Sequence, residues 1–255
     1  MPRLSRKFLS GKFFHVMVQG INKEFIFNTN ENKDKYKKII LKNYEKVDES
    51  ELNILSYCLM SNHTHFLFFC ENFPLLSTFM HKVNSAYSKY YNKSYSRVGY
   101  VFRDRFKVQE IIDMDHLYNC IRYIHNNPVK AGICSSMGDY KYSSYNEFFG
   151  LKEIINDKSI ELLFGNNSNY ISCFENIHVN FNSKDFLEIR DTDIKDFTNA
   201  YLSRNCISFN DIKNNKVELK IFIKEAKKET NITLTDLATF LGLSRNIVGY
   251  QYRKP

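Results

Sequence analysis

Hydrophobic and polar positions along the first 130 residues change period several times, which predicts a domain of mixed helices and strands. Four short runs rich in aromatic and β-branched residues are typical of strands, and we expect them at 13–19, 52–60, 63–70 and 100–112. Apolar residues recur at helical spacing over 33–46, 73–91 and 115–126. Ser61 and Asn62 form a turn between two strands, and Pro128 is expected to end the third helix.

The order of these elements is β-α-β-β-α-β followed by a further helix. This order is typical of the split βαβ (ferredoxin-like) arrangement, an α+β fold in which an antiparallel sheet carries its helices on one face. The opposite face of the sheet is then available for a functional site.

The composition changes after about residue 150. Residues 151–220 are rich in Asn, Ser, Asp and Lys, and we expect a connector with short helices there. Residues 221–255 return to helical spacing, and the segment 233–248 predicts two helices that meet at Gly242. The second of these helices is capped by Ser244, so the pair is similar to a helix-turn-helix, although two ordinary packed helices give the same pattern. We therefore expect divisions at 1–150, 151–220 and 221–255, with Arg245 on or near a DNA-contacting helix.

Charge narrows the class of partner. The chain carries 36 Lys and Arg against 28 Asp and Glu, a net charge of +8, which favours a polyanion such as nucleic acid. No apolar run reaches the length that spans a bilayer, and the basic segment 1–7 lacks the features of a signal peptide, so we expect a cytoplasmic protein without a membrane partner. The six cysteines include no CxxC pair, which argues against a zinc site.

Two short segments carry candidate chemistry. His63 and His65 lie two residues apart in an expected strand, so both imidazoles should project from the same side of the sheet. Tyr123 and Asn127 are four residues apart on an expected helix and share a face. Two neutral histidines and an oxygen ligand can hold a divalent metal, and a tyrosine beside the metal can attack a phosphodiester. The alternatives are two ordinary polar residues at a strand start and a packed aromatic.

Basic residues flank this region. Arg103, Arg105 and Lys107 alternate with other residues along the expected fourth strand, and they form either a phosphate-binding track beside the site or a solvated face. Arg3 and Arg6 could extend such a track.

Several motifs in a fixed order give the chain a family resemblance. They are Met1–Arg3, His15–Asn22, Tyr57–His65, Gly99–Phe106, Tyr123–Gly132 and Tyr140–Tyr145. Together they resemble the single-tyrosine HUH transposases of the insertion-sequence class, and most closely the REP-associated tyrosine transposases. Two positions depart from the family pattern, because Thr64 replaces a large apolar residue and Tyr142 replaces a tryptophan.

The resemblance implies a specific activity for 1–150. His63, His65 and Asn127 would bind Mg²⁺ or Mn²⁺, and Tyr123 would be the nucleophile that cleaves and rejoins single-stranded DNA near a hairpin through a 5′-phosphotyrosine link. The protein would act as a monomer or homodimer. Three other functions remain open: a non-catalytic DNA-binding regulator that uses the C-terminal helices, an RNA-binding protein on the same fold, and a plasmid replication initiator or relaxase.

Overall fold

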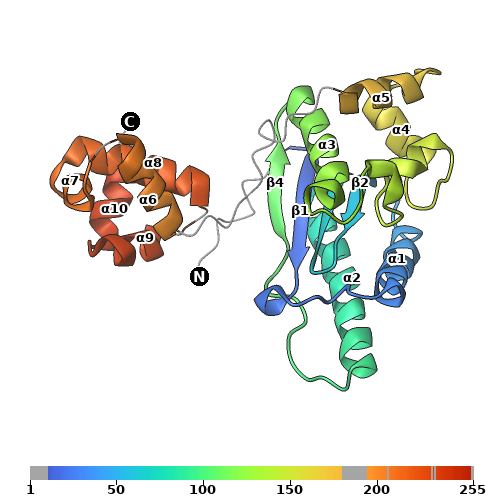
Figure 1. Ribbon diagram of the computed structural model, residues 1–255, viewed down its shortest axis with the longest axis horizontal. Coiled ribbons are helices and arrows are strands. Elements are labelled where there is room, and N and C mark those ends of the chain that lie inside the picture. Colours follow the sequence, from blue (N-terminus) through green and yellow to red (C-terminus); the bar gives the residue numbers. More distant parts are fainter. Residues whose placement is uncertain (1–10, 180–193, 206, 231, 233, 254–255) are drawn as a thin grey trace. The chain divides into compact units, whose positions relative to one another are not determined.

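A computed structural model describes residues 11–179, 194–205, 207–230, 232 and 234–253. The chain divides into two compact units, one within 11–179 and the other within 194–253, and each is described by itself (Figure 1). In the described residues, no helix is long and apolar enough to cross a membrane.

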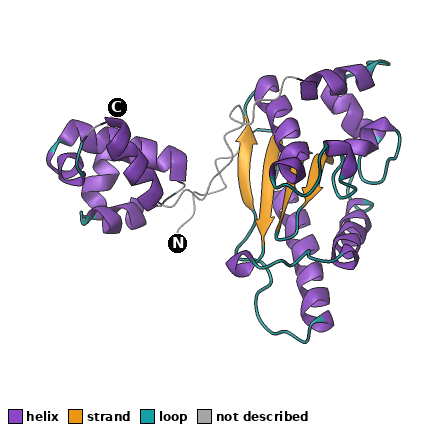
Figure 2. Cartoon of the chain, viewed as in Figure 1, coloured by secondary structure: helices purple, strands orange, loops and turns teal. Residues whose placement is uncertain are grey.

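The first unit is built on a four-stranded sheet (Figure 2). Its strands are β1 (Phe13–Gln19), β2 (Leu52–Leu59), β3 (His63–Cys70) and β4 (Lys107–Ile111). Their spatial order is β2-β3-β1-β4, and all neighbouring strands are antiparallel. This order confirms the predicted split βαβ topology and the α+β class.

Strand register divides the side chains between the two faces of the sheet. Met17 lies opposite both His65 and Lys107, so these three residues form one row across β3, β1 and β4. Because alternate residues of a strand point to opposite faces, the odd-numbered residues of β1, β3 and β4 share the face of His65. Ser56 and Cys58 of β2 join them, since Cys58 lies opposite His65, whereas a register shift between Ile54 and Ser56 places Ile54 opposite Phe68 on the other face.

The other face of the sheet is apolar and is covered by two helices. These are α1 (Asn30–Tyr44) and α2 (Phe73–Ser94), which begin at the side-chain caps Thr29 and Asn72. Aromatic rings fill the layer between helices and sheet, with ring centres 5.9 Å apart for Phe68 and Phe79 and 6.4 Å apart for Tyr36 and Phe66. Large buried rings of this kind supply much of the hydrophobic stabilisation of a core.

The helix α3 (Met114–Lys130) packs against β2 and β3. It contacts the face that carries His65, so that face is not bare as the split βαβ pattern alone had suggested. The prediction that Pro128 ends this helix is wrong, because α3 continues to Lys130. The fixed φ of proline is compatible with a helix, and the chain leaves the helix at Gly132, which adopts a left-handed φ of 67°.

The fourth strand is shorter than predicted. It begins at Lys107, whereas residues 100–106 form a loop with a single bridge between Phe102 and Gly20. The alternation that predicted a strand comes from apolar anchors: Val101, Phe102 and Phe106 are buried, while the residues between them are exposed.

Short helices complete the first unit beyond residue 130. They are η3 (Met137–Asp139), η4 (Tyr145–Phe149), α4 (Asp157–Phe164) and α5 (Tyr170–Val179), and η2 (Ile21–Lys23) follows β1.

The carboxylate of Glu147 in η4 accepts hydrogen bonds from the Tyr57 hydroxyl and from three successive backbone N–H groups at 153–155. Helix α4 contacts β2 and α5 contacts α3, so both belong to the first unit. The functional divisions at 150 and 220 stay a prediction.

The second unit is entirely helical in its described residues. It consists of α6 (Ile194–Asn205), α7 (Phe209–Asn214), α8 (Lys216–Thr230), α9 (Leu234–Leu241) and α10 (Arg245–Arg253). Its core is separate from that of the sheet and is built from buried side chains such as Phe222, Ile223 and Leu237. The predicted helix, turn and helix at 233–248 are present as α9, Gly242 and α10, although residue 233 lies outside the described residues.

Candidate active site

His63 and His65 open strand β3 and project from the same side of the sheet. His63 is half-buried, whereas His65 is fully buried. Their ring centres are 4.9 Å apart and the rings are perpendicular. Thr64 lies between them and points to the opposite face. The predicted strand therefore brings both imidazoles together, close enough to share one ion.

A third histidine from β1 extends this pair. Nε2 of His15 lies 3.0 Å from Nδ1 of His65, and the two rings are nearly parallel. His15 also hydrogen-bonds to Gln109 of β4. Sequence reasoning missed this role of His15, although a histidine inside the apolar run Phe13–Val18 was a signal that it needed a buried partner.

Burial keeps all three imidazoles neutral. Loss of hydration lowers the pKa of His63 to about 4, and burial together with the nearby His116 lowers the pKa of His15 to about 3. The pKa of His65 falls well below 6.5, first through burial and then through its two histidine neighbours. Neutral imidazole is the form that binds metal ions.

Helix α3 brings Tyr123 to the histidines. The Tyr123 side chain is only 5% exposed, and its ring centre lies 5.4 Å from that of His65 and 6.0 Å from that of His15, with edge-to-face geometry in both cases. The ammonium of Lys130 lies 5.9 Å from the centre of the Tyr123 ring. The phenol ring thus packs against the histidine cluster although 57 residues separate it from His65 in the sequence.

Asn127 follows one helical turn after Tyr123 and is half-buried. Its amide nitrogen donates a hydrogen bond of 2.8 Å to the Tyr123 carbonyl. This bond uses the nitrogen, and the oxygen is the atom through which an asparagine ligates a cation. Because α3 continues past Pro128, the two residues lie on one unbroken helix.

The predicted basic residues occupy different positions. Lys107 begins β4 on the same face as His65. Arg103 and Arg105 are exposed in the loop that precedes β4, so the expectation of three cations on one strand is wrong. The backbone of Arg103 donates to the carbonyl of Gln19, and Gln19 lies opposite His63 in the sheet. The loop therefore begins beside the histidine end of β3.

The remaining predicted contacts lie elsewhere. Arg3 and Arg6 are outside the described residues. Arg245 begins α10 in the second unit, and its Nε donates to the Thr235 hydroxyl over 3.1 Å.

The donor set can be tested against the implied metal. Among the residues that the structure describes, no three His, Cys, Asp or Glu side chains are grouped to hold an ion. The third donor that the sequence predicts is the amide oxygen of Asn127, which lies on the same helix as Tyr123. Imidazole nitrogen favours softer metals, whereas an oxygen donor suits Mn²⁺ and Mg²⁺. Three protein ligands would leave coordination positions for phosphate oxygens.

A second buried histidine network lies on the far side of α3. Nε2 of His125 is 3.0 Å from the Ser56 hydroxyl and 2.8 Å from the Ser144 hydroxyl, and its Nδ1 is 3.0 Å from Nε2 of His178. His178 in turn bonds to the carbonyl of Phe174. This network joins α3 to β2, η4 and α5, so His125 is structural.

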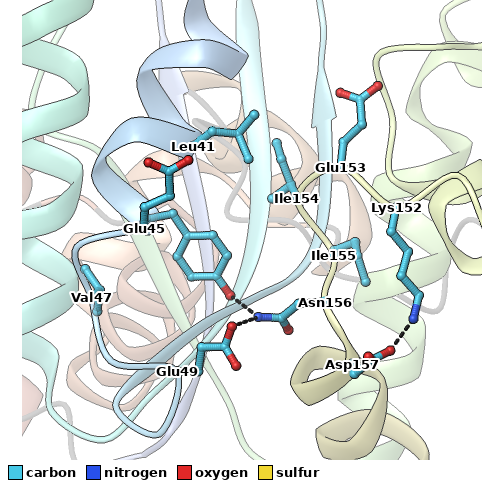
Figure 3. A pocket seen from close by; sticks show the side chains of 11 residues that line it. Leu41, Glu45, Val47, Glu49, Lys152, Glu153, Ile154, Ile155, Asn156 and Asp157 are labelled. Carbon is cyan, nitrogen blue, oxygen red and sulfur yellow. Dashed lines mark hydrogen bonds and ion pairs between the residues drawn. The ribbon is translucent and has the colours of Figure 1, made fainter.

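A surface pocket of about 630 Å³ lies between the end of α1 and residues 152–157 (Figure 3). The Asn156 amide reaches Glu49 and the Tyr44 hydroxyl inside it, and Lys152 pairs with Asp157 at its rim. No residue of the histidine cluster lines this pocket, and its several carboxylates are unsuited to binding phosphate groups.

Comparisons with known proteins were made for the whole chain. No curated protein matches the chain. A solved structure of a REP-associated tyrosine transposase bound to a REP hairpin is similar over 60% of this chain and 90% of that chain, with 18% identity and a TM-score of 0.48. The family model described as "Transposase IS200 like" matches residues 10–127, a segment that holds the histidines, Tyr123 and Asn127. The segment 10–127 is therefore similar to the IS200-like transposases.

Proposed function

We propose that the first unit is a metal-dependent transposase that cleaves and rejoins single-stranded DNA through a covalent link to Tyr123. The observation that carries the proposal is the contact between the Tyr123 ring and His65, in a segment that matches a transposase family model. A tyrosine placed against neutral histidines is arranged for attack on a phosphodiester beside a cation.

His63 and His65 would hold Mg²⁺ or Mn²⁺ together with Asn127. When bound, the metal polarises the phosphoryl oxygens and stabilises the departing oxygen. His65 would ligate through Nε2, because Nδ1 is engaged with His15. Nδ1 of His65 then carries the hydrogen and donates it to His15, which fixes the ring orientation as a ligand requires.

Tyr123 supplies the nucleophilic oxygen. An unperturbed phenol has a pKa of about 10, so the Tyr123 hydroxyl would give up its proton to water as it attacks. The Tyr123 oxygen attacks phosphorus, the bond from phosphorus to the 3′ oxygen breaks, and that oxygen takes up a proton. The products are a 5′-phosphotyrosine and a free 3′-hydroxyl. Attack by a 3′-hydroxyl on the phosphotyrosine reverses the exchange and joins a strand, so no nucleotide cofactor is consumed.

The loop before β4 provides a surface for an unpaired strand. Tyr100 is 83% exposed and Arg103 and Arg105 are exposed beside it. An exposed aromatic with neighbouring cations binds single strands through base stacking and phosphate contacts. The loop begins beside His63, so a strand held there would pass close to the histidine cluster.

A covalent adduct assay tests the proposal. The substrate is a single-stranded hairpin oligonucleotide from the DNA flanking the gene, labelled at either end and incubated with Mn²⁺ or with EDTA before a denaturing gel. We expect the 3′-labelled strand to shift to the protein band, because Tyr123 retains the 5′ phosphate, whereas the 5′-labelled strand becomes a shorter free fragment.

Variants identify the nucleophile and the ligand. Tyr123→Phe and His63→Ala should abolish the adduct. Tyr118→Phe is the matched control on the same helix, since the Tyr118 hydroxyl donates to the Leu163 carbonyl of α4 instead, and it should keep the adduct. An adduct that survives in Tyr123→Phe, or in EDTA, would contradict the proposal.

A further inference from the structure

The turn between α9 and α10 is fixed by local hydrogen bonds. Gly242 adopts a φ of 65°, which only glycine accepts without strain. The N–H groups of Gly242 and Leu243 return to carbonyls of α9 over 3.1 and 2.9 Å. Ser244 then caps α10 by accepting from the N–H of Ile247. The two helices are therefore held at a set angle by the turn.

The inner surfaces of the pair are packed. Ala238 and Leu241 of α9 and Val248 of α10 are buried in the second core. Helix α10 also packs against α8. A small side chain at Ala238 lets the two helices approach closely.

The outer surface of α10 is exposed and carries the residue types that read base pairs. Arg245 and Asn246 are exposed in its first turn, and Ile247 and Tyr250 are 46% and 60% exposed. Arginine pairs with guanine, asparagine pairs with adenine, and an apolar group contacts the thymine methyl in the major groove. The Nε of Arg245 donates to the Thr235 hydroxyl, which restrains the orientation of the guanidinium.

Charge at this surface suits a polyanion. Residues 194–253 contain ten Lys and Arg against six Asp and Glu, and no acidic residue follows Asp236. The described acidic side chains lie on α7 and α8 and are engaged there. Asp211 bonds to Ser208, Glu218 to Tyr201 and Glu225 to Arg204.

We propose that the second unit binds double-stranded DNA and reads its sequence with α10 in the major groove, while α9 lies across the backbone. This is the docking geometry of helix-turn-helix proteins. The chain would then hold two DNA sites of different kinds, one for an unpaired strand in the first unit and one for a duplex in the second. The inference does not rest on the proposed transposase chemistry.

The test uses the full-length protein in EDTA, with excess unlabelled single-stranded oligonucleotide to occupy the first unit. Duplexes of random sequence are selected by binding and sequenced, and affinity for an enriched duplex is then compared with that for a scrambled duplex by fluorescence anisotropy. We expect enrichment of a short motif that contains guanine. A bidentate arginine–guanine contact contributes about 1–3 kcal/mol of discrimination, so Arg245→Ala should weaken binding to the enriched duplex by about 5- to 150-fold.

Two further variants separate sequence reading from charge. Arg245→Lys keeps the charge but loses the planar fork, so it should lose preference for the motif and retain binding to the scrambled duplex. Arg204→Ala is the matched control, because Arg204 is exposed on α6 and pairs with Glu225, and it should leave the preference intact. Circular dichroism checks that each variant is folded.

Three outcomes would overturn the proposal. They are the absence of any enriched sequence, an equal loss of affinity in Arg245→Ala and Arg204→Ala, and a change of oligomeric state in Arg245→Ala without a change in DNA selection. The last result would make α10 an interface between copies of the chain.

Discussion

Replacing His15 by leucine would test whether His15 orients the metal ligand His65 without binding the metal itself. His15 is 2% exposed, and its Nε2 is 3.0 Å from Nδ1 of His65. Leucine fills a similar space but offers no hydrogen-bond acceptor. In the variant, the Nδ1 hydrogen of His65 has lost its His15 partner, and the ring has lost the contact that sets its orientation.

The size of the effect follows from this lost bond. A buried donor deprived of its acceptor costs about 1–3 kcal/mol, and loss of a partner behind a metal-ligating histidine typically lowers metal affinity by about 10- to 100-fold. The two figures agree, because a tenfold change corresponds to about 1.4 kcal/mol. His15→Leu should therefore bind Mn²⁺ about 10- to 100-fold more weakly than the unchanged protein.

Isothermal titration with Mn²⁺ measures the affinity, and urea unfolding without metal measures stability. His81→Leu is the control, since His81 is exposed on α2 and its loss should change neither quantity. His15→Gln restores an acceptor and should recover part of the affinity. Equal Mn²⁺ affinity in folded His15→Leu and the unchanged protein would refute the orienting role, whereas no Mn²⁺ binding by the unchanged protein would refute the metal site.

Three other perturbations test the fold that supports the site. Glu147→Gln should lower the free energy of unfolding by about 1–3 kcal/mol, because an amide cannot accept the four hydrogen bonds that end on this carboxylate; Glu161→Gln, at a surface ion pair, should have little effect in the same urea titration. Burial lowers the pKa of His178 to about 4, so the unfolded chain binds more protons than the folded chain between about pH 6.5 and 4. The free energy of unfolding should therefore fall as the pH drops through this window. Unfolding measured at several pH values should show a shallower fall in His178→Gln. Gly20→Ala should lower the melting temperature, because the added Cβ would lie 2.4 Å from the carbonyl oxygen of Glu24. Gly138→Ala is the control, since its Cβ would meet no atom closer than 3.6 Å. An unchanged melting temperature in Gly20→Ala would show that this turn shifts at little cost.

The elements of the sheet could be predicted closely because their patterns are local. The first three strands and the two helices that cover them lie within a few residues of the predicted ranges, since each depends on its own periodicity. The predictions were wrong where one local pattern is compatible with two structures. The alternation at 100–106 arises from buried residues that anchor a loop, and Pro128 lies within α3 and does not end it.

The candidate site was only partly visible in the sequence. Its two pairs, His63 with His65 and Tyr123 with Asn127, follow from strand and helix spacing. The contact between Tyr123 and His65 and the hydrogen bond from His15 depend on strand register and on which face α3 covers, and no short segment encodes either. Arg245 and its surroundings show the same limit, because the spacing predicted the helix pair but not which side of α10 stays exposed.

Strand register also has a consequence for how this protein tolerates mutation. In β1 and β3 the odd-numbered positions share the face of His65, whereas the even-numbered positions line the aromatic layer under α1 and α2. A scan of every substitution along Phe13–Gln19 and His63–Cys70 should therefore alternate with a period of two. Even positions would set how much protein accumulates, and odd positions near His65 would set how much of it is active, so abundance and activity can be selected almost independently within one strand.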